Sequence, residues 1–365
     1  MENNMQTDKS HASRILYLDI IKCISIFLVV FCHTPLLNKN SVVGNIAMII
    51  CWGAVPCFFM VTGAIILNKE KKFDFKRYIN KLISIYLIIC IWKIIYLIFY
   101  NFFGNIKINA FSKGQIINYI LLFSSLKGIT VGHFWFMYAY LSIYIIYPMF
   151  NLCFKNFNDY KNLLIFLLLA IFIISILPQT FGLILKYFNI NSINFNEIIN
   201  VNPFGKYSHM LFYFLFGGFL YKYNLYEKCK KNKIISCISI VLIIIGIIGL
   251  MLVKKYYANT FEWQGIYLKD GYKWFSTVLL SIGLFVFLQG RKYKFKYLNK
   301  ILSYIGKNTM GIFYLHILVI QLLMKIDIVQ RGTLVNTLKT IIVVFISAVI
   351  TTLLKKIPVI KKLVQ

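Results

Sequence analysis

The chain is 365 residues long, with 59% hydrophobic and 17% aromatic residues and a mean hydropathy of +0.73. Because soluble domains are roughly 45–50% apolar, this composition excludes a soluble globular protein and predicts an all-α integral membrane protein. The formal net charge of +29 would suit a nucleic-acid partner, but the placement of the basic residues along the chain excludes that class, as the connections described below indicate.

Ten apolar stretches follow one another along the chain, each near the ~20 residues that a helix needs to cross a bilayer. We therefore expect a single transmembrane domain over residues 1–365 with about ten helices. The first stretch follows a polar start without a small-residue cleavage site, which predicts a retained anchor and not a removed signal peptide. The predicted spans are residues 15–37, 42–68, 79–103, 133–150, 162–180, 207–224, 233–253, 272–289, 303–325 and 334–354.

Lysine and arginine gather in alternate connections between these stretches. The basic connections are the N-terminal segment and residues 68–81, 151–161, 222–233 and 290–307. The positive-inside rule places these connections, and with them both chain termini, in the cytoplasm. Basic runs such as 69–72 and 291–296 are expected to contact anionic membrane lipids and no nucleic acid.

The first span carries three ionisable side chains: Asp19, Lys22 and His33. The spacing from Lys22 to His33 corresponds to about 16 Å along a helix and about 20° around it, and Asp19 falls on the same side. Ionisable groups inside a membrane are functional candidates by default. The alternative is a buried Asp19–Lys22 ion pair that steadies the bundle, with His33 at the outer water boundary.

Other histidines lie in or beside later spans. His133 opens the fourth span at the head of an aromatic run, His209 lies early in the sixth, and His316 lies near the middle of the ninth. With His33, the first two are predicted near the outer surface. Histidine suits a general base because its pKa lies close to neutral. The alternatives are residues of an interfacial aromatic belt and, for His316, a neutral imidazole bonded to another helix.

Basic residues also lie in the predicted cytoplasmic half of the spans, namely Lys22, Arg77, Lys81 and, deeper, Lys93. Cations in this position would hold the phosphates of a phosphorylated donor. The alternative is that the long side chains reach back to the interface. These residues would form a basic vestibule on the cytoplasmic side that leads toward the outer histidines. Transfer of a group across the membrane needs such an arrangement.

The eight cysteines are scattered along the chain, without a C-x-x-C pair. They are interpreted as small apolar residues of the interior. The histidines also lack the close spacing of metal ligands, so no metal site is predicted.

Several motifs resemble the membrane-bound acyltransferase family 3 of bacterial O-acyltransferases, and the likeness covers nearly the whole chain. The most specific is Lys22 followed after ten residues by His33, which is similar to the family's basic residue and histidine in the first span. Thr62 replaces the usual serine, and Asn80 stands where a second arginine after Arg77 is often found. The other similar motifs are residues 56–63 (PCFFMVTG), 133–136 (HFWF) with Tyr144 and Pro148, and 306–316 (GKNTMGIFYLH).

The resemblance implies a multi-pass O-acyltransferase of the bacterial inner membrane that modifies cell-envelope polysaccharide. Its donor would be cytoplasmic acyl-CoA, in the first place acetyl-CoA, and its acceptor a hydroxyl of a surface polysaccharide or lipid-linked glycan. His33 would act as a general base or carry the acyl group itself, with Asp19 orienting Lys22. The donor would contact Lys22, Arg77 and Lys81, and the acceptor would contact His133, Trp135 and His316.

Two other functions stay open on the sequence alone. A carrier or flippase for a lipid-linked glycan would use the same outer polar residues for binding and would need no acyl donor. A membrane sensor or assembly module would need neither site and would tolerate alanine at Lys22 and His33 together. Assembly as a homo-oligomer is a further open alternative.

Overall fold

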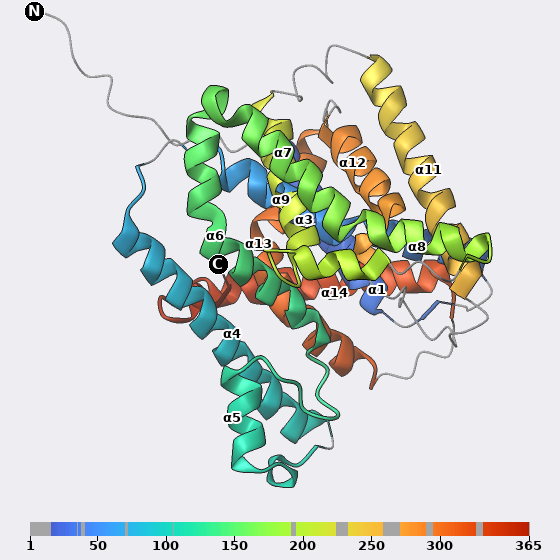
Figure 1. The fold of residues 1–365 in the computed structure, drawn as a ribbon. Helices are drawn as coiled ribbons and strands as arrows, with labels where there is room; N and C mark the ends of the chain where they lie inside the picture. Colours follow the sequence, from blue (N-terminus) through green and yellow to red (C-terminus); the bar gives the residue numbers. More distant parts are fainter. Residues whose placement is uncertain are drawn as a thin grey trace, which may run out of the picture.

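The computed structural model of the protein describes residues 16–34, 36–37, 41–69, 72–104, 106–190, 195–223, 233–257, 271–289, 295–325 and 331–364. The N-terminal segment and parts of the basic runs lie outside these ranges. The described residues form helices, and none of them lies in a β-strand. Figure 1 shows α4 and α5 extending from one side of the bundle. The helices are α1 (Leu16–His33), α2 (Val42–Cys51), α3 (Ala54–Ile66), α4 (Phe75–Phe103), α5 (Lys113–Leu121), α6 (Trp135–Lys155), α7 (Phe157–Ser175), α8 (Leu177–Tyr187), α9 (Ser208–Lys222), α11 (Lys233–Tyr257), α12 (Phe275–Gln289), α13 (Lys296–Leu323) and α14 (Thr333–Leu354), with the short 3-10 segments η1 (Ile108–Ala110), η2 (Gly132–Phe134), η3 (Phe195–Val201), η4 (Gly271–Lys273) and η5 (Ile360–Val364).

Seven of the described helical segments are long and apolar enough to cross a membrane, in agreement with the predicted membrane class. Each of the ten predicted ranges contains a helix, but α9 and α12 have only 15 residues, and the first half of α13 is rich in lysine and asparagine. The count of ten spans and the cytoplasmic termini therefore stay predictions. The seven segments are Leu16–His33, Val42–Ile66, Phe75–Phe103, Gly132–Lys155, Phe157–Ser175, Lys233–Tyr256 and Thr333–Leu354.

The bundle has two ends. At one of them, here called the histidine end, α1 ends and α6, α9, α12 and α14 begin. There the Leu36 amide donates a hydrogen bond to Asn336 Oδ1 (3.1 Å), and the Gly332 amide donates to the Leu36 carbonyl (2.8 Å). At the opposite end, here called the lysine end, Asn151 Nδ2 donates to the Leu67 carbonyl (2.9 Å) and ties α6 to the end of α3. In the predicted topology the lysine end faces the cytoplasm.

Helices α3 and α9 pack backbone against backbone at two glycines. A Cβ atom added at Gly63 would lie 1.7 Å from the Phe214 carbonyl oxygen, and one at Gly217 would lie 2.0 Å from the Met60 carbonyl oxygen. Small residues allow membrane helices to approach this closely. The contact fixes α3, which supplies Thr62 to the central cavity described below.

The connection between α4 and α6 contains α5 and is fastened to α4 by Lys93. The fully buried Lys93 side chain donates from Nζ to the Ser124 carbonyl (3.1 Å) and lies 4.7 Å from the centre of the Tyr119 ring. The Tyr119 hydroxyl in turn donates to the Lys93 carbonyl (3.1 Å). The structure therefore places Lys93 outside the basic vestibule that the sequence predicted, because its amine is used to hold this connection.

Candidate active site

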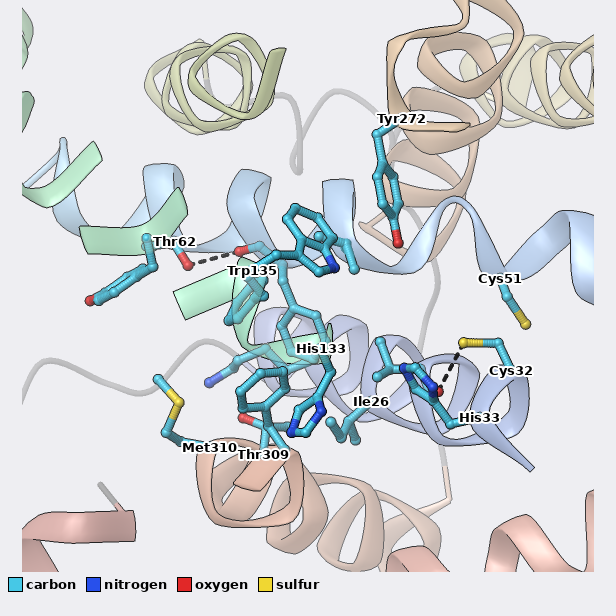
Figure 2. A pocket seen from close by; sticks show the side chains of 17 residues that line it. Ile26, Cys32, His33, Cys51, Thr62, His133, Trp135, Tyr272, Thr309 and Met310 are labelled. Carbon is cyan, nitrogen blue, oxygen red and sulfur yellow. Dashed lines mark hydrogen bonds between the residues drawn. The ribbon is translucent and has the colours of Figure 1, made fainter. Parts of the chain in front are cut away.

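A central cavity lies among α1, α3, α6 and α13 and holds about 940 Å³ free of protein atoms, including the part open to solvent. Lys22 lines it toward the lysine end, while His33 and His133 line it toward the histidine end. Figure 2 shows its side chains pointing inward from several helices. Its walls are mainly apolar and aromatic. The other lining residues are Ile26, Val29, Cys32, Cys51, Val55, Phe58, Thr62, Trp135, Phe136, Tyr140, Tyr272, Thr309, Met310 and Phe313.

Three histidines from separate segments meet at the histidine end of this cavity. The ring centres of His33 and His316 are 5.3 Å apart, those of His133 and His316 are 5.2 Å apart, and those of His33 and His133 are 6.3 Å apart. The sequence predicted His33, His133 and His209 near the outer surface and His316 nearer the bilayer middle, with His133 and His316 both in contact with the acceptor. We call the three rings the histidine cluster. In the described part of the chain, no group of His, Cys, Asp or Glu residues has the geometry of a metal site.

His316 lies behind the other two histidines. It is fully buried and does not line the central cavity, so its position does not provide the acceptor contact predicted for it. Its Nδ1 lies 2.6 Å from the Phe313 carbonyl and 3.2 Å from the Ile312 carbonyl. Because a carbonyl only accepts, Nδ1 carries the proton of the neutral ring and Nε2 keeps a lone pair. That Nε2 atom is buried and has no hydrogen-bond partner among the described residues.

Tyr96 fixes the proton of His133. The Tyr96 hydroxyl donates to the Tyr314 carbonyl (2.9 Å), so its oxygen accepts from His133 Nε2 (3.2 Å). The neutral His133 ring then keeps its lone pair on Nδ1, which is also buried without a partner in the described residues. The sequence analysis missed Tyr96. The available signal was a tyrosine inside an apolar span, since a buried phenol hydroxyl usually finds a hydrogen-bond partner.

At the lysine end, Lys22 Nζ lies 2.8 Å from Asp19 Oδ1. The Asp19 side chain is 3% exposed and the Lys22 side chain 18%. Ser303 Oγ of α13 donates to Asp19 Oδ2 (3.2 Å). The ion pair therefore lies within α1, the Ser303 hydrogen bond joins it to α13, and its lysine lines the central cavity.

The structure does not bring Arg77 and Lys81 into the central cavity. The Arg77 side chain is 75% exposed, with Nε 3.9 Å from Asp74 Oδ2, and Lys81 is also exposed. Both lie in the first turns of α4, which packs on α6 through the Tyr78 ring, stacked on Tyr144 with a centre distance of 5.8 Å. The two predicted donor-binding residues therefore lie outside the cavity wall.

Aromatic rings close part of the cavity at the histidine end. The Trp135 ring centre lies 5.1 Å from that of Tyr272 and 6.5 Å from that of Tyr207. Trp135 itself lines the cavity, which is where the predicted contact with the acceptor requires it to be. His209 is buried and lines neither this cavity nor the neighbouring polar cleft. That cleft is lined by Ser175, Asn202, Gly205, Lys206, Ser208 and Lys273.

Comparison with known proteins gives one match. A family model described as an acyltransferase domain matches residues 15–355. The matched region contains all residues of the central cavity and of the histidine cluster. No curated protein and no solved structure matches the chain.

Proposed function

This chain belongs to the acyltransferase family whose model covers residues 15–355, and on that premise we propose that it transfers an acyl group from cytoplasmic acyl-CoA to a hydroxyl of a surface or lipid-linked glycan. Acetyl is the proposed group, and the bacterial inner membrane the proposed location. One observation carries this proposal: a single cavity has Lys22 toward one end and His33 and His133 toward the other.

The separation of Lys22 and His33, which both line the central cavity, suits an extended thioester arm. The pantetheine arm of CoA has about as many chain bonds as four amino-acid residues, which when extended span roughly 14 Å. Lys22 and His33 are separated by about 16 Å along α1. A donor whose phosphates stay at the lysine end therefore brings its thioester close to His33. The apolar walls would exclude water that hydrolyses the thioester.

In the proposed reaction His33 acts as the general base. It takes the proton of the acceptor hydroxyl as the oxygen attacks the thioester carbonyl. When the C–S bond breaks, the protonated ring gives its proton to the departing CoA sulfur, so that an ester and free CoA remain. A hydrogen bond from the other N–H of His33 to either bare nitrogen, His133 Nδ1 or His316 Nε2, would orient its ring. A transient acyl group on His33 would give the same products in two steps.

The acceptor would enter from the histidine end. Trp135 and Tyr272 offer flat aromatic faces to a sugar ring there, and His133 lies beside them on the cavity wall. The polar cleft next to this entrance would let the rest of a hydroxyl-rich glycan stay in water.

The proposal is tested by measuring ester-linked acetate on purified cell-surface polysaccharide from wild-type, deletion and complemented strains. Loss of acetate in the deletion strain and its return on complementation are expected. A carrier for a lipid-linked glycan would instead leave the acetate content of the exported glycan unchanged and would cause glycan to accumulate inside the deletion strain.

We expect the Asp19–Lys22 ion pair to contribute separately to the stability of the protein and to acyl transfer. Lys22→Gln removes the cation that lies 2.8 Å from a buried carboxylate, which costs about 3–5 kcal/mol, so the amount of protein in the membrane should fall. Adding Asp19→Asn removes the charge of that carboxylate and should restore that amount, but not acyl transfer. Immunoblots of membranes and polysaccharide acetate measure the two effects. Full acyl transfer by the double variant would mean that Lys22 has a structural role only.

A further inference from the structure

A second basic region lies at the lysine end, between the starts of α1 and α13. A groove there holds about 930 Å³ free of protein atoms, including the part open to solvent. We call it the lysine groove. Its polar lining residues are Lys296, Asn299, Lys300, Ser303, Tyr304 and Lys307.

The lysine groove is built to hold negative charge. Lys296, Lys300 and Lys307 fall within about 40° of one another around α13. Within the described ranges, none of the three has a carboxylate oxygen within 4.0 Å. Helix α13 begins at Lys296, and its N-cap residue Phe295 makes no side-chain cap. The first backbone N–H groups and the positive end of this 28-residue helix therefore add to the charge of the lysines.

One carboxylate connects the lysine groove to the central cavity. Ser303, which lines the groove, donates to Asp19 Oδ2, and Asp19 Oδ1 pairs with Lys22, which lines the cavity. Gly306 lets α13 approach α1 at this level, since a Cβ there would lie 2.4 Å from the Asp19 carbonyl oxygen. The groove thus lies beside the end of the cavity through which the donor would enter.

We propose that the lysine groove binds the phosphate groups of acyl-CoA while the pantetheine arm enters the central cavity beside Lys22. The inference rests on the proposed function and names the donor subsite for it. The groove supplies three lysine amines, whereas Arg77 and Lys81 are exposed on α4. A phosphate could also come from a lipid headgroup, and the experiment separates the two sources.

The test uses purified full-length protein in nanodiscs, with polysaccharide from the deletion strain as acceptor and thiol release as the readout. Two donors are compared: acetyl-CoA and S-acetylpantetheine, which has no phosphate. The Lys300→Gln/Lys307→Gln variant should raise KM for acetyl-CoA about 10-fold, because each lost charged hydrogen bond weakens phosphate binding. KM for S-acetylpantetheine and kcat with both donors should stay within about 2-fold of wild type. Lys72→Gln/Lys76→Gln, which changes two exposed lysines just before and in the first turn of α4, is the matched control and should leave both KM values unchanged.

Each other outcome counts against the lysine groove as the donor site. An equal rise of KM for both donors would show an effect on the fold of the bundle, and no rise would leave the groove without a role in donor binding. A difference that occurs only in nanodiscs with phosphatidylglycerol, and not with phosphatidylcholine alone, would assign the groove to lipid headgroups. If wild-type protein transfers acetyl from neither donor, the proposed function itself fails.

Discussion

Replacing His33 by alanine is expected to abolish acyl transfer while the protein stays in the membrane at its normal level. A general base contributes about 10²- to 10⁴-fold to rate, and neither His133 nor His316 can replace it. The lone-pair nitrogens of these two rings, His133 Nδ1 and His316 Nε2, are both buried away from solvent. His33 itself is half-buried at the end of α1, so its truncation should cost little stability.

The measurement is ester-linked acetate on purified cell-surface polysaccharide, normalised to the amount of protein in the membrane. Cys32→Ala is the matched control because Cys32 precedes His33, lines the same cavity and donates its thiol to the Val29 carbonyl of its own helix. It should keep near-normal transfer. Tyr96→Phe removes the oxygen that fixes His133 and should lower transfer by about 10-fold, as expected for one neutral hydrogen bond. Full acyl transfer by a His33→Ala variant that is present in the membrane at the normal level would show that the proposed mechanism is wrong.

Substituting alanine for Gly63 is expected to remove most of the protein from the membrane. The new Cβ would lie 1.7 Å from the Phe214 carbonyl oxygen, which belongs to helix backbone and cannot turn aside. Helices α3 and α9 would have to separate, and overpacking of this kind costs about 1–3 kcal/mol or more. Gly217→Ala should behave in the same way, because its Cβ would meet the Met60 carbonyl at 2.0 Å.

Membrane level and thermal unfolding in detergent measure this effect. Gly182→Ala in α8 is the matched control, because a Cβ there meets nothing within 4 Å. It should be neutral or slightly stabilising, since alanine favours a helix over glycine by roughly 0.5–1 kcal/mol. Equal stability of Gly63→Ala and Gly182→Ala would mean that α3 and α9 do not pack as closely as described.

The transmembrane helices and the ionisable face of the first span could be predicted from the sequence. Helix periodicity is local, so Asp19, Lys22 and His33 fall on one side of any helix that contains them. The structure confirms the helix over Leu16–His33 and places Lys22 and His33 in one cavity. The helix at each predicted range follows from the length of its apolar stretch, because backbone polar groups in a bilayer must be satisfied within the segment.

Which residues of different helices lie together could not be predicted in the same way. The sequence placed His316 nearer the bilayer middle than His33 and proposed Arg77 beside Lys22, whereas the structure brings the rings of His316 and His33 together and leaves Arg77 at the surface of α4. Neither Tyr96 nor the lysine groove stood out from the sequence, because their significance depends on residues that lie far away along the chain.

By itself, the sequence determined a helical membrane protein, the approximate positions of its long apolar helices and one face of α1 that carries an acid, a base and an imidazole. Only the tertiary structure decided which imidazoles meet, which of their nitrogens keep a lone pair, and which lysines lie beside the cavity. The physical reason is that hydropathy and periodicity act within one helix. Contact between helices depends instead on small residues such as Gly63 and Gly306, and on which backbone carbonyls they allow to come close.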